Sequence, residues 1–163
     1  MLDRNGFVYL LGPLDGYYKI GRAKNVSNRM KLVSPKLPYH VELVLFIKVP
    51  NMMKLEADLH KFFKSKRGNG EWFKLSVPDL LYIDAYKKLA EASESENPLA
   101  IGKAQKNLRI AHEEVAKFNR QRQQLPASKL KKFDLEQKEL SADVANDFRR
   151  LYIKPFTYNA SRA

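Results

Sequence analysis

The N-terminal segment predicts a β-hairpin, which commits the first part of this chain to a β-sheet. Residues 6–11 are rich in β-branched and aromatic side chains, residues 13–16 have the turn-forming sequence Pro-Leu-Asp-Gly, and residues 17–21 form a returning strand. Neighbouring strands of a hairpin lie about 4.8 Å apart. We therefore expect Tyr9 and Lys19 to project into one small area of the sheet surface.

The sequence after the hairpin alternates between helix and strand signals. Asn25 is placed to cap a helix that Pro35 ends, and residues 39–49 predict a third strand. The nearly continuous apolar centre of that strand favours a position in the middle of the sheet. Further segments predict, in order, a helix, a short strand and a helix at residues 52–64, 71–75 and 78–92. The expected fold class is α/β of the α+β type, a small, mainly antiparallel sheet of three to four strands flanked by helices.

A domain boundary is expected near the middle of the chain. The segment EASESENP at residues 91–98 is polar and acidic and ends in proline, as domain boundaries often do. It predicts a first domain at residues 1–92 that folds alone, a linker at residues 93–98 and a basic helical extension at residues 99–163 that binds DNA, mediates dimerisation or does both.

The extension predicts two helices separated by a break at residues 124–128. Apolar side chains in the first of them repeat at intervals of three and four residues, which makes a heptad seam of Ile101, Ala104, Leu108, Ala111, Val115 and Phe118. Such a seam needs a partner helix. The second helix of the same chain would supply one as a helical hairpin, and a second copy of the chain would supply one as a homodimer through residues 99–151. We favour the dimer, because the second apolar face is less regular.

Charge indicates the kind of partner. Thirty Lys and Arg against eighteen Asp and Glu give a net charge of +12, which attracts polyanions, and nucleic acid is the commonest polyanion in the cytoplasm. The excess is +5 over residues 1–98 and +7 over residues 99–163, so both halves can contact phosphate. The absence of cysteine excludes disulfides and thiolate metal sites and suits a cytoplasmic protein of a bacterial host cell. We expect no membrane span, because no apolar run approaches about 20 residues, and the N-terminus lacks the features of a signal peptide.

Five short motifs follow one another in a defined order. They are GFVY at residues 6–9, KIG at residues 19–21, Arg29, the helix segment with Glu56 and His60, and GEWF at residues 70–73. Together they resemble the GIY-YIG nuclease superfamily, in particular the phage-associated branch whose second motif is KIG and whose domain ends in Glu-Trp-Phe. The resemblance covers about residues 6–75.

The resemblance implies a role for each matching residue. The catalytic residues would be Tyr9, Lys19, Arg29 and His60, and Glu56 would hold a divalent metal, Mg²⁺ or Mn²⁺. Lys19 stands where the commonest family pattern has a tyrosine. The late asparagine of the family has no secure counterpart here, and Asn69 is a poor candidate for it.

The chemistry of phosphodiester cleavage fits these residue types. It requires a base near the attacking water, positive charge around the phosphate and help for the leaving oxygen. The Lys19 ammonium would lower the pKa of Tyr9 and so favour the phenolate as the base. Arg29 offers a bidentate fork to phosphate oxygens, and Glu56 offers Mg²⁺ a hard oxygen ligand.

Helical position leaves two alternatives open for the helix residues. Glu56 falls at the edge of an apolar arc, so it is expected to be half-buried, either as a metal ligand or as a boundary carboxylate paired with a lysine. His60, one turn later, is equally consistent with a catalytic group and with a hydrogen-bonded boundary histidine. A zinc site is rejected, because no third or fourth ligand is placed nearby.

Basic side chains flank this constellation on both sides. We expect the DNA backbone to be positioned by Arg22, Lys24, Lys31, Lys66 and Arg67. The sequence thus predicts a metal-dependent DNA endonuclease of GIY-YIG type, encoded by a phage or another mobile element. The alternative is a non-catalytic, repressor-like DNA-binding protein that retains the nuclease scaffold.

Overall fold

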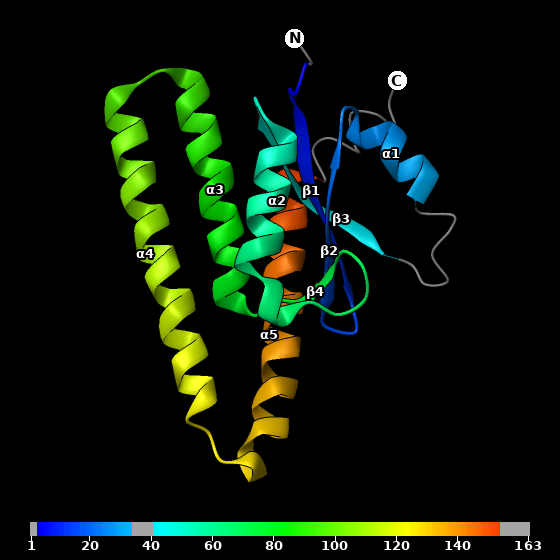
Figure 1. Cartoon of the computed structure of the whole chain (residues 1–163), viewed down its shortest axis with the longest axis vertical. Helices are drawn as coiled ribbons and strands as arrows, with labels where there is room; N and C mark the ends of the chain where they lie inside the picture. Colours follow the sequence, from blue (N-terminus) through cyan, green and yellow to red (C-terminus); the bar gives the residue numbers. More distant parts are fainter. Residues whose placement is uncertain (1–2, 34–40, 154–163) are drawn as a thin grey trace. The chain divides into compact units, whose positions relative to one another are not determined.

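A four-stranded antiparallel sheet forms the centre of the N-terminal part of the chain. The computed structural model describes residues 3–33 and 41–153, without the side chains of residues 31–33. The strands are β1 (Gly6–Leu14), β2 (Tyr17–Ala23), β3 (Glu42–Val49) and β4 (Trp72–Lys74), in the order β3-β1-β2-β4 (Figure 1). The predicted fold class is confirmed.

The hairpin of β1 and β2 forms where the sequence predicted it. Leu14 pairs with Tyr17, so Asp15 and Gly16 alone make the turn. Both have positive φ angles, 51° and 84°, which a two-residue hairpin of the primed type requires and which an Asp-Gly pair adopts readily. The hairpin was therefore predictable from local sequence.

The predicted position of the third strand was wrong. β3 lies at an edge of the sheet and pairs with β1, not in the middle. Its apolar run has another cause: Val44 and Leu45 point to opposite faces, and both side chains are fully buried. Both faces of this edge strand are buried. A strand that is buried on both faces needs a continuous apolar sequence, whether it lies at the edge or in the centre of the sheet. The expected start of the strand at residues 39–40 falls outside the described residues.

Five α-helices and one 3₁₀ turn make up the other described elements. They are α1 (Val26–Val33), α2 (Met52–Phe62), the 3₁₀ turn η2 (Lys64–Lys66), α3 (Val77–Ser95), α4 (Pro98–Gln123) and α5 (Ala127–Tyr152). Asparagine side chains cap α1 and α2: Asn25 Oδ1 accepts from Asn28 N at 2.9 Å, and Asn51 Oδ1 accepts from Lys54 N at 3.1 Å. The end of the first helix at Pro35 falls outside the described residues.

Most of the segment predicted as a linker is helical. α3 continues through Ser95, and Glu96 and Asn97 alone separate it from α4. Glu96 ends α3 in a left-handed conformation with φ of 57°, and Asn97 caps α4. Pro98 therefore begins a helix instead of ending a segment, because proline is well tolerated at the first helical position.

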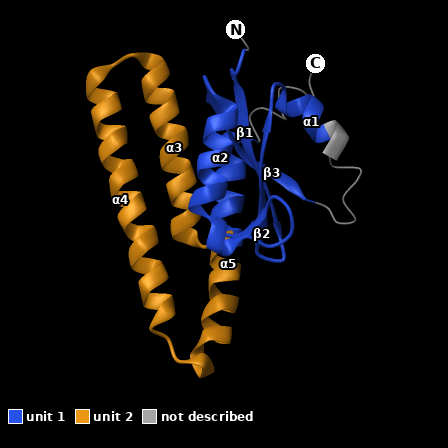
Figure 2. Cartoon of the chain, viewed as in Figure 1, with its two compact units in different colours: residues 1–75, 142–163 blue, residues 76–141 orange. Residues whose placement is uncertain are grey.

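The described residues divide into two compact units (Figure 2). Unit 1 contains Met1–Leu75 and Ala142–Ala163, and unit 2 contains Ser76–Ser141. The last part of α5 thus belongs with the sheet: Arg149 forms an ion pair with Glu42 of β3, and Ala145 and Phe148 are buried. These units have other bounds than the domains expected from the sequence.

The heptad seam of α4 has a partner inside unit 2. α3 and α4 lie side by side along their lengths, and the seam residues Ala104 and Val115 are buried. The expected hairpin partner, α5, meets the seam at Phe118, whose ring lies 5.5 Å from that of Phe133. Packing on α3 was not expected, because the acidic segment at the end of α3 looked like a linker. The homodimer through residues 99–151 stays a prediction.

Candidate active site

Tyr9 lies across the glycine of the KIG motif. Tyr9 pairs with Gly21 across β1 and β2, and a Cβ atom on Gly21 would lie 2.4 Å from Tyr9 Oη and 2.5 Å from Tyr9 Cζ. The tyrosine side chain is 1% exposed. Its hydroxyl group is buried and has no hydrogen-bond partner among the described residues. Glycine is required at position 21 because the tyrosine ring occupies the space of any side chain there.

Gly21→Ala is expected to destabilise the protein by about 1–3 kcal/mol, because the buried Tyr9 ring must move away from the new methyl group. Urea unfolding of the variant and the parent measures the change. Gly102→Ala in α4 is the matched control: nothing lies within 4 Å of its added Cβ, so it should stabilise by about 0.5–1 kcal/mol through helix propensity. Equal stability of Gly21→Ala and the parent would contradict the contact.

The Arg29 guanidinium is the cation that acts most strongly on Tyr9. Burial raises the pKa of Tyr9, and this effect outweighs the nearby Arg29, which lowers it without the geometry of a hydrogen bond. The expectation of a lowered tyrosine pKa was therefore wrong, because the sequence did not show that the ring is buried. Tyr9 is a neutral phenol at neutral pH. Arg29 of α1 thus lies near Tyr9 of β1, and the catalytic role of both residues stays a prediction.

Lys19 has a different partner from the expected one. It lies opposite Leu11 in the hairpin, and its ammonium forms an ion pair with the Glu71 carboxylate at 3.7 Å. Glu71 is held beside β2, since its carbonyl oxygen accepts a hydrogen bond from Ile20 N at 3.1 Å. The negative charge of Glu71 also raises the pKa of both Tyr9 and Arg29. Glu71 is part of the GEWF motif, but the sequence did not predict a role for it. The signal was present, because the short strand that begins next to Glu71 was expected in the same sheet as the KIG strand.

Glu56 is buried at the N-terminal half of α2, with 7% of its surface exposed. Its Oε1 accepts a hydrogen bond from Arg22 Nη1 at 2.6 Å. Arg22 was expected to contact DNA, but its guanidinium lies on this carboxylate. The Glu56 charge, like that of Glu71, raises the pKa of Tyr9 and of Arg29. Of the two alternatives left open, the boundary pairing exists, with an arginine in place of a lysine, and a metal ligand is compatible with it.

His60 fastens α2 to the KIG strand. Its Nε2 lies 2.8 Å from the carbonyl oxygen of Ile20. Because a carbonyl oxygen can only accept a hydrogen bond, Nε2 carries a proton and donates it. The imidazole ring also lies 5.0 Å from the Phe73 ring, between centroids. The arrangement matches the hydrogen-bonded boundary histidine, one of the two alternatives that the sequence left open. Because Glu56 lies one turn earlier on the same helix, the hydrogen bond also positions Glu56 next to β2.

The candidate site lies along β2 where its outer edge is open. β4 pairs with β2 only from Tyr17 to Lys19; beyond Ile20, β1 is the one described strand beside β2. Tyr9 and Gly21 share the sheet face that packs against Met30 of α1. Glu56 comes from α2 and binds Arg22, the residue after Gly21, which projects to the opposite face. Tyr9 from one face of the sheet and Glu56 from the other are therefore both next to this edge of β2.

Several of the expected DNA-binding side chains make contacts within the chain. Lys24 Nζ donates to the carbonyl oxygens of Asp3 and Asn5, each at 2.7 Å, and it lowers the pKa of Asp3 together with the backbone N–H of Asn5, whose effect is larger. The Arg67 guanidinium carbon lies 5.8 Å from the centre of the Phe73 ring. Lys66 is half-buried in η2. The Lys31 side chain falls outside the described residues.

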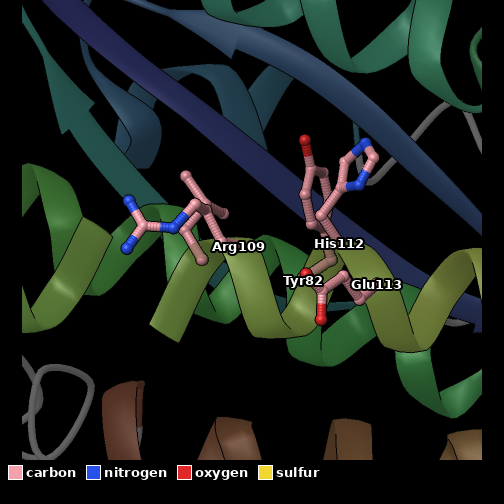
Figure 3. A pocket seen from close by; sticks show the side chains of 5 residues that line it. Tyr82, Arg109, His112 and Glu113 are labelled. Carbon is pink, nitrogen blue, oxygen red and sulfur yellow. The ribbon is translucent and has the colours of Figure 1, made fainter. Parts of the chain in front are cut away.

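A separate hollow lies in unit 2 between α3 and α4 (Figure 3). Its volume is about 380 Å³, and it is lined by Tyr82, Leu108, Arg109, His112 and Glu113. The rings of Tyr82 and His112 meet edge-on at 6.0 Å between centroids. None of the residues predicted for catalysis lines it. Within the described residues, no group of three or more His, Cys, Asp or Glu is arranged to hold a metal ion, and no helix is long and apolar enough to cross a membrane.

Comparison with known proteins gives a family match over the candidate site. The family model of the T5orf172 domain matches residues 6–90, slightly more than half of the chain. That range includes every residue placed in the site above, from Tyr9 to Glu71. No curated protein and no solved structure matches the chain.

Proposed function

Because this chain belongs to the family of T5orf172 domains, which are phage-associated, we propose that it is a divalent-metal-dependent DNA endonuclease of GIY-YIG type. It would be encoded by a phage or another mobile element and act in the cytoplasm of a bacterial host. One observation carries the proposal: residues far apart in the sequence gather at one end of β2. Tyr9 packs on Gly21, and the next residue, Arg22, binds the buried Glu56 of α2. Arg29 of α1 lies close enough to Tyr9 to affect its pKa.

Each side chain has a task in hydrolysis of a phosphodiester bond. Arg29 is exposed, and its guanidinium can bind two phosphate oxygens at once and stabilise the charge that develops on them. Tyr9 has a buried hydroxyl group, and its task is to pack beside Arg29 and help to position that guanidinium. Lys19, held by Glu71, adds a second positive charge beside the phosphate.

The residues present fit Mg²⁺ or Mn²⁺ held by a single protein carboxylate. Glu56 offers one hard oxygen ligand, and one of its oxygens already accepts from Arg22. With no cluster of three ligands in the described part of the chain, the remaining ligands would be phosphate oxygens and water, which is an ordinary arrangement for Mg²⁺. When bound, the ion supplies Lewis-acid stabilisation of charge on the phosphate. Glu56 would hold it, and Arg22 and His60 set the position of Glu56.

A nicking assay tests the proposal. The parent protein is expected to convert supercoiled plasmid to open circles in Mg²⁺ or Mn²⁺ and to lose this activity in EDTA. Agarose gels give the rate, and a Glu56→Gln preparation purified in the same way controls for contaminating nucleases. Equal nicking by both preparations would contradict the proposal.

The alternative, a DNA-binding protein without turnover, has a specific observation in its favour. Lys19 replaces the tyrosine of the commonest family pattern, and its ammonium is paired with Glu71. Tyr9 also has a raised pKa, so the phenolate that would act as the base is scarcely present at neutral pH. Tight DNA binding without nicking under any metal condition would favour this alternative.

A further inference from the structure

The end of α4 and the start of α5 form a strongly basic surface. Residues 117–132 contain no Asp or Glu and six cationic side chains, which we call the basic tip: Lys117, Arg120, Arg122, Lys129, Lys131 and Lys132. In unit 2 these residues come together because α4 and α5 meet in a hairpin at this end (Figure 2). The sequence predicted that the basic extension at residues 99–163 contacts phosphate, but it did not show that these six side chains form one surface.

Specific contacts hold the two helix ends together. Arg122 binds Asp134 through two hydrogen bonds, Nε to Oδ1 at 2.8 Å and Nη2 to Oδ2 at 2.7 Å. The Phe118 and Phe133 rings lie 5.5 Å apart. In the turn, Lys129 N donates to the Pro126 carbonyl oxygen at 2.9 Å. These contacts give the basic tip a fixed structure, and Arg122 contributes to that structure by binding Asp134.

The other five cations have no such role in the fold. All five are exposed, and none forms an ion pair with a described residue, in contrast to Arg122. Five like charges without counter-charges repel one another, which costs stability unless an anionic partner is bound. Amide and hydroxyl groups lie between them, on Asn119, Gln121, Gln123, Gln124 and Ser128. Such side chains contact phosphate and sugar oxygens in protein–DNA complexes.

We propose that the basic tip is a second DNA-contacting surface, which binds the phosphate backbone of duplex DNA without reading its sequence. The choice of DNA rests on the proposed function. An anionic membrane fits less well, because membrane-surface helices insert large apolar side chains, and none of the exposed ones in the described residues falls within the tip. The tip thus adds affinity outside the family-matched segment at residues 6–90.

The test removes charge from the tip in the full-length protein. Lys129, Lys131 and Lys132 are changed together to Gln, which has a similar helix propensity to lysine. Affinity for a short duplex is measured by fluorescence anisotropy at several salt concentrations. Each lost phosphate contact reduces the slope of log K against log salt by about 0.9. We expect the slope to fall by about 3 and the affinity near 0.1 M salt to fall on the order of a hundredfold.

The matched control removes the same charge elsewhere in unit 2. Lys103, Lys106 and Arg109 of α4 are exposed, and their change to Gln should lower the slope by clearly less. Equal slopes for the two triple variants would overturn the proposal, as would a parent that binds anionic vesicles but not DNA. The same samples are assayed for nicking at saturating DNA. If the tip substitutions weaken DNA binding but the parent does not nick DNA, the endonuclease proposal fails and the basic tip proposal stands. If the parent nicks DNA but the tip substitutions leave the salt slope unchanged, only the basic tip proposal fails.

Discussion

Glu56→Gln is expected to lower the rate of DNA cleavage about a thousandfold, because under the proposed function it removes the carboxylate that would hold the divalent ion. A catalytic metal contributes several kcal/mol of transition-state stabilisation, and each 1.36 kcal/mol corresponds to a factor of about ten in rate. DNA affinity should be unchanged or slightly raised, since a negative charge near the phosphate disappears. The side chains are isosteric, and Arg22, the partner of Glu56, has a partly exposed side chain, so folding should be preserved.

A control on the same helix separates loss of the ligand from loss of charge. Asp58 is exposed and pairs with Lys54 at 2.9 Å, so Asp58→Asn changes net charge equally and should leave cleavage unaltered. Plasmid nicking gives the rates, and anisotropy gives the affinities. A Glu56→Gln protein that cleaves within tenfold of the parent would remove Glu56 from the metal site.

Phe148→Ala is expected to destabilise the protein by about 3–5 kcal/mol, which is typical of a buried phenylalanine truncated to alanine. Phe148 is 6% exposed, near the end of α5, in the part of that helix that belongs with the sheet of unit 1. The sequence analysis expected residues 1–92 to fold alone, and a fragment of those residues lacks Phe148 altogether. We therefore expect the fragment to be much less stable than the full chain.

Leu151→Ala is the matched control for this stability test. Leu151 lies three residues further along α5 but is 66% exposed, so its truncation should change stability by no more than about 0.5 kcal/mol. Denaturant unfolding of both variants gives the two free energies. If both variants matched the parent, the C-terminal turns of α5 would have no part in the stability of unit 1.

Local signals were strong enough to predict most of the helices and strands. The Asp15-Gly16 turn, the asparagine caps and the apolar periodicity of α2, α4 and α5 all depend on residues close together in the chain. The ordered motifs grouped Tyr9, Arg29 and Glu56 as one candidate site, which stays a prediction, and in the structure both Arg29 and Glu56 affect the pKa of Tyr9. Such features follow from short-range backbone preferences and from side-chain spacing.

The sequence by itself determined which segments are helices and strands, because caps, turns and periodicity are local. The tertiary structure alone decided what surrounds each side chain. Burial raised the pKa of Tyr9 where the sequence suggested a lowered one, and Glu71 took Lys19 as its partner. The same holds for the elements: β3 became an edge strand, and α4 packed on α3. A side chain's solvent exposure and partners depend on residues far away in the chain, and sequence spacing carries no information about those distances.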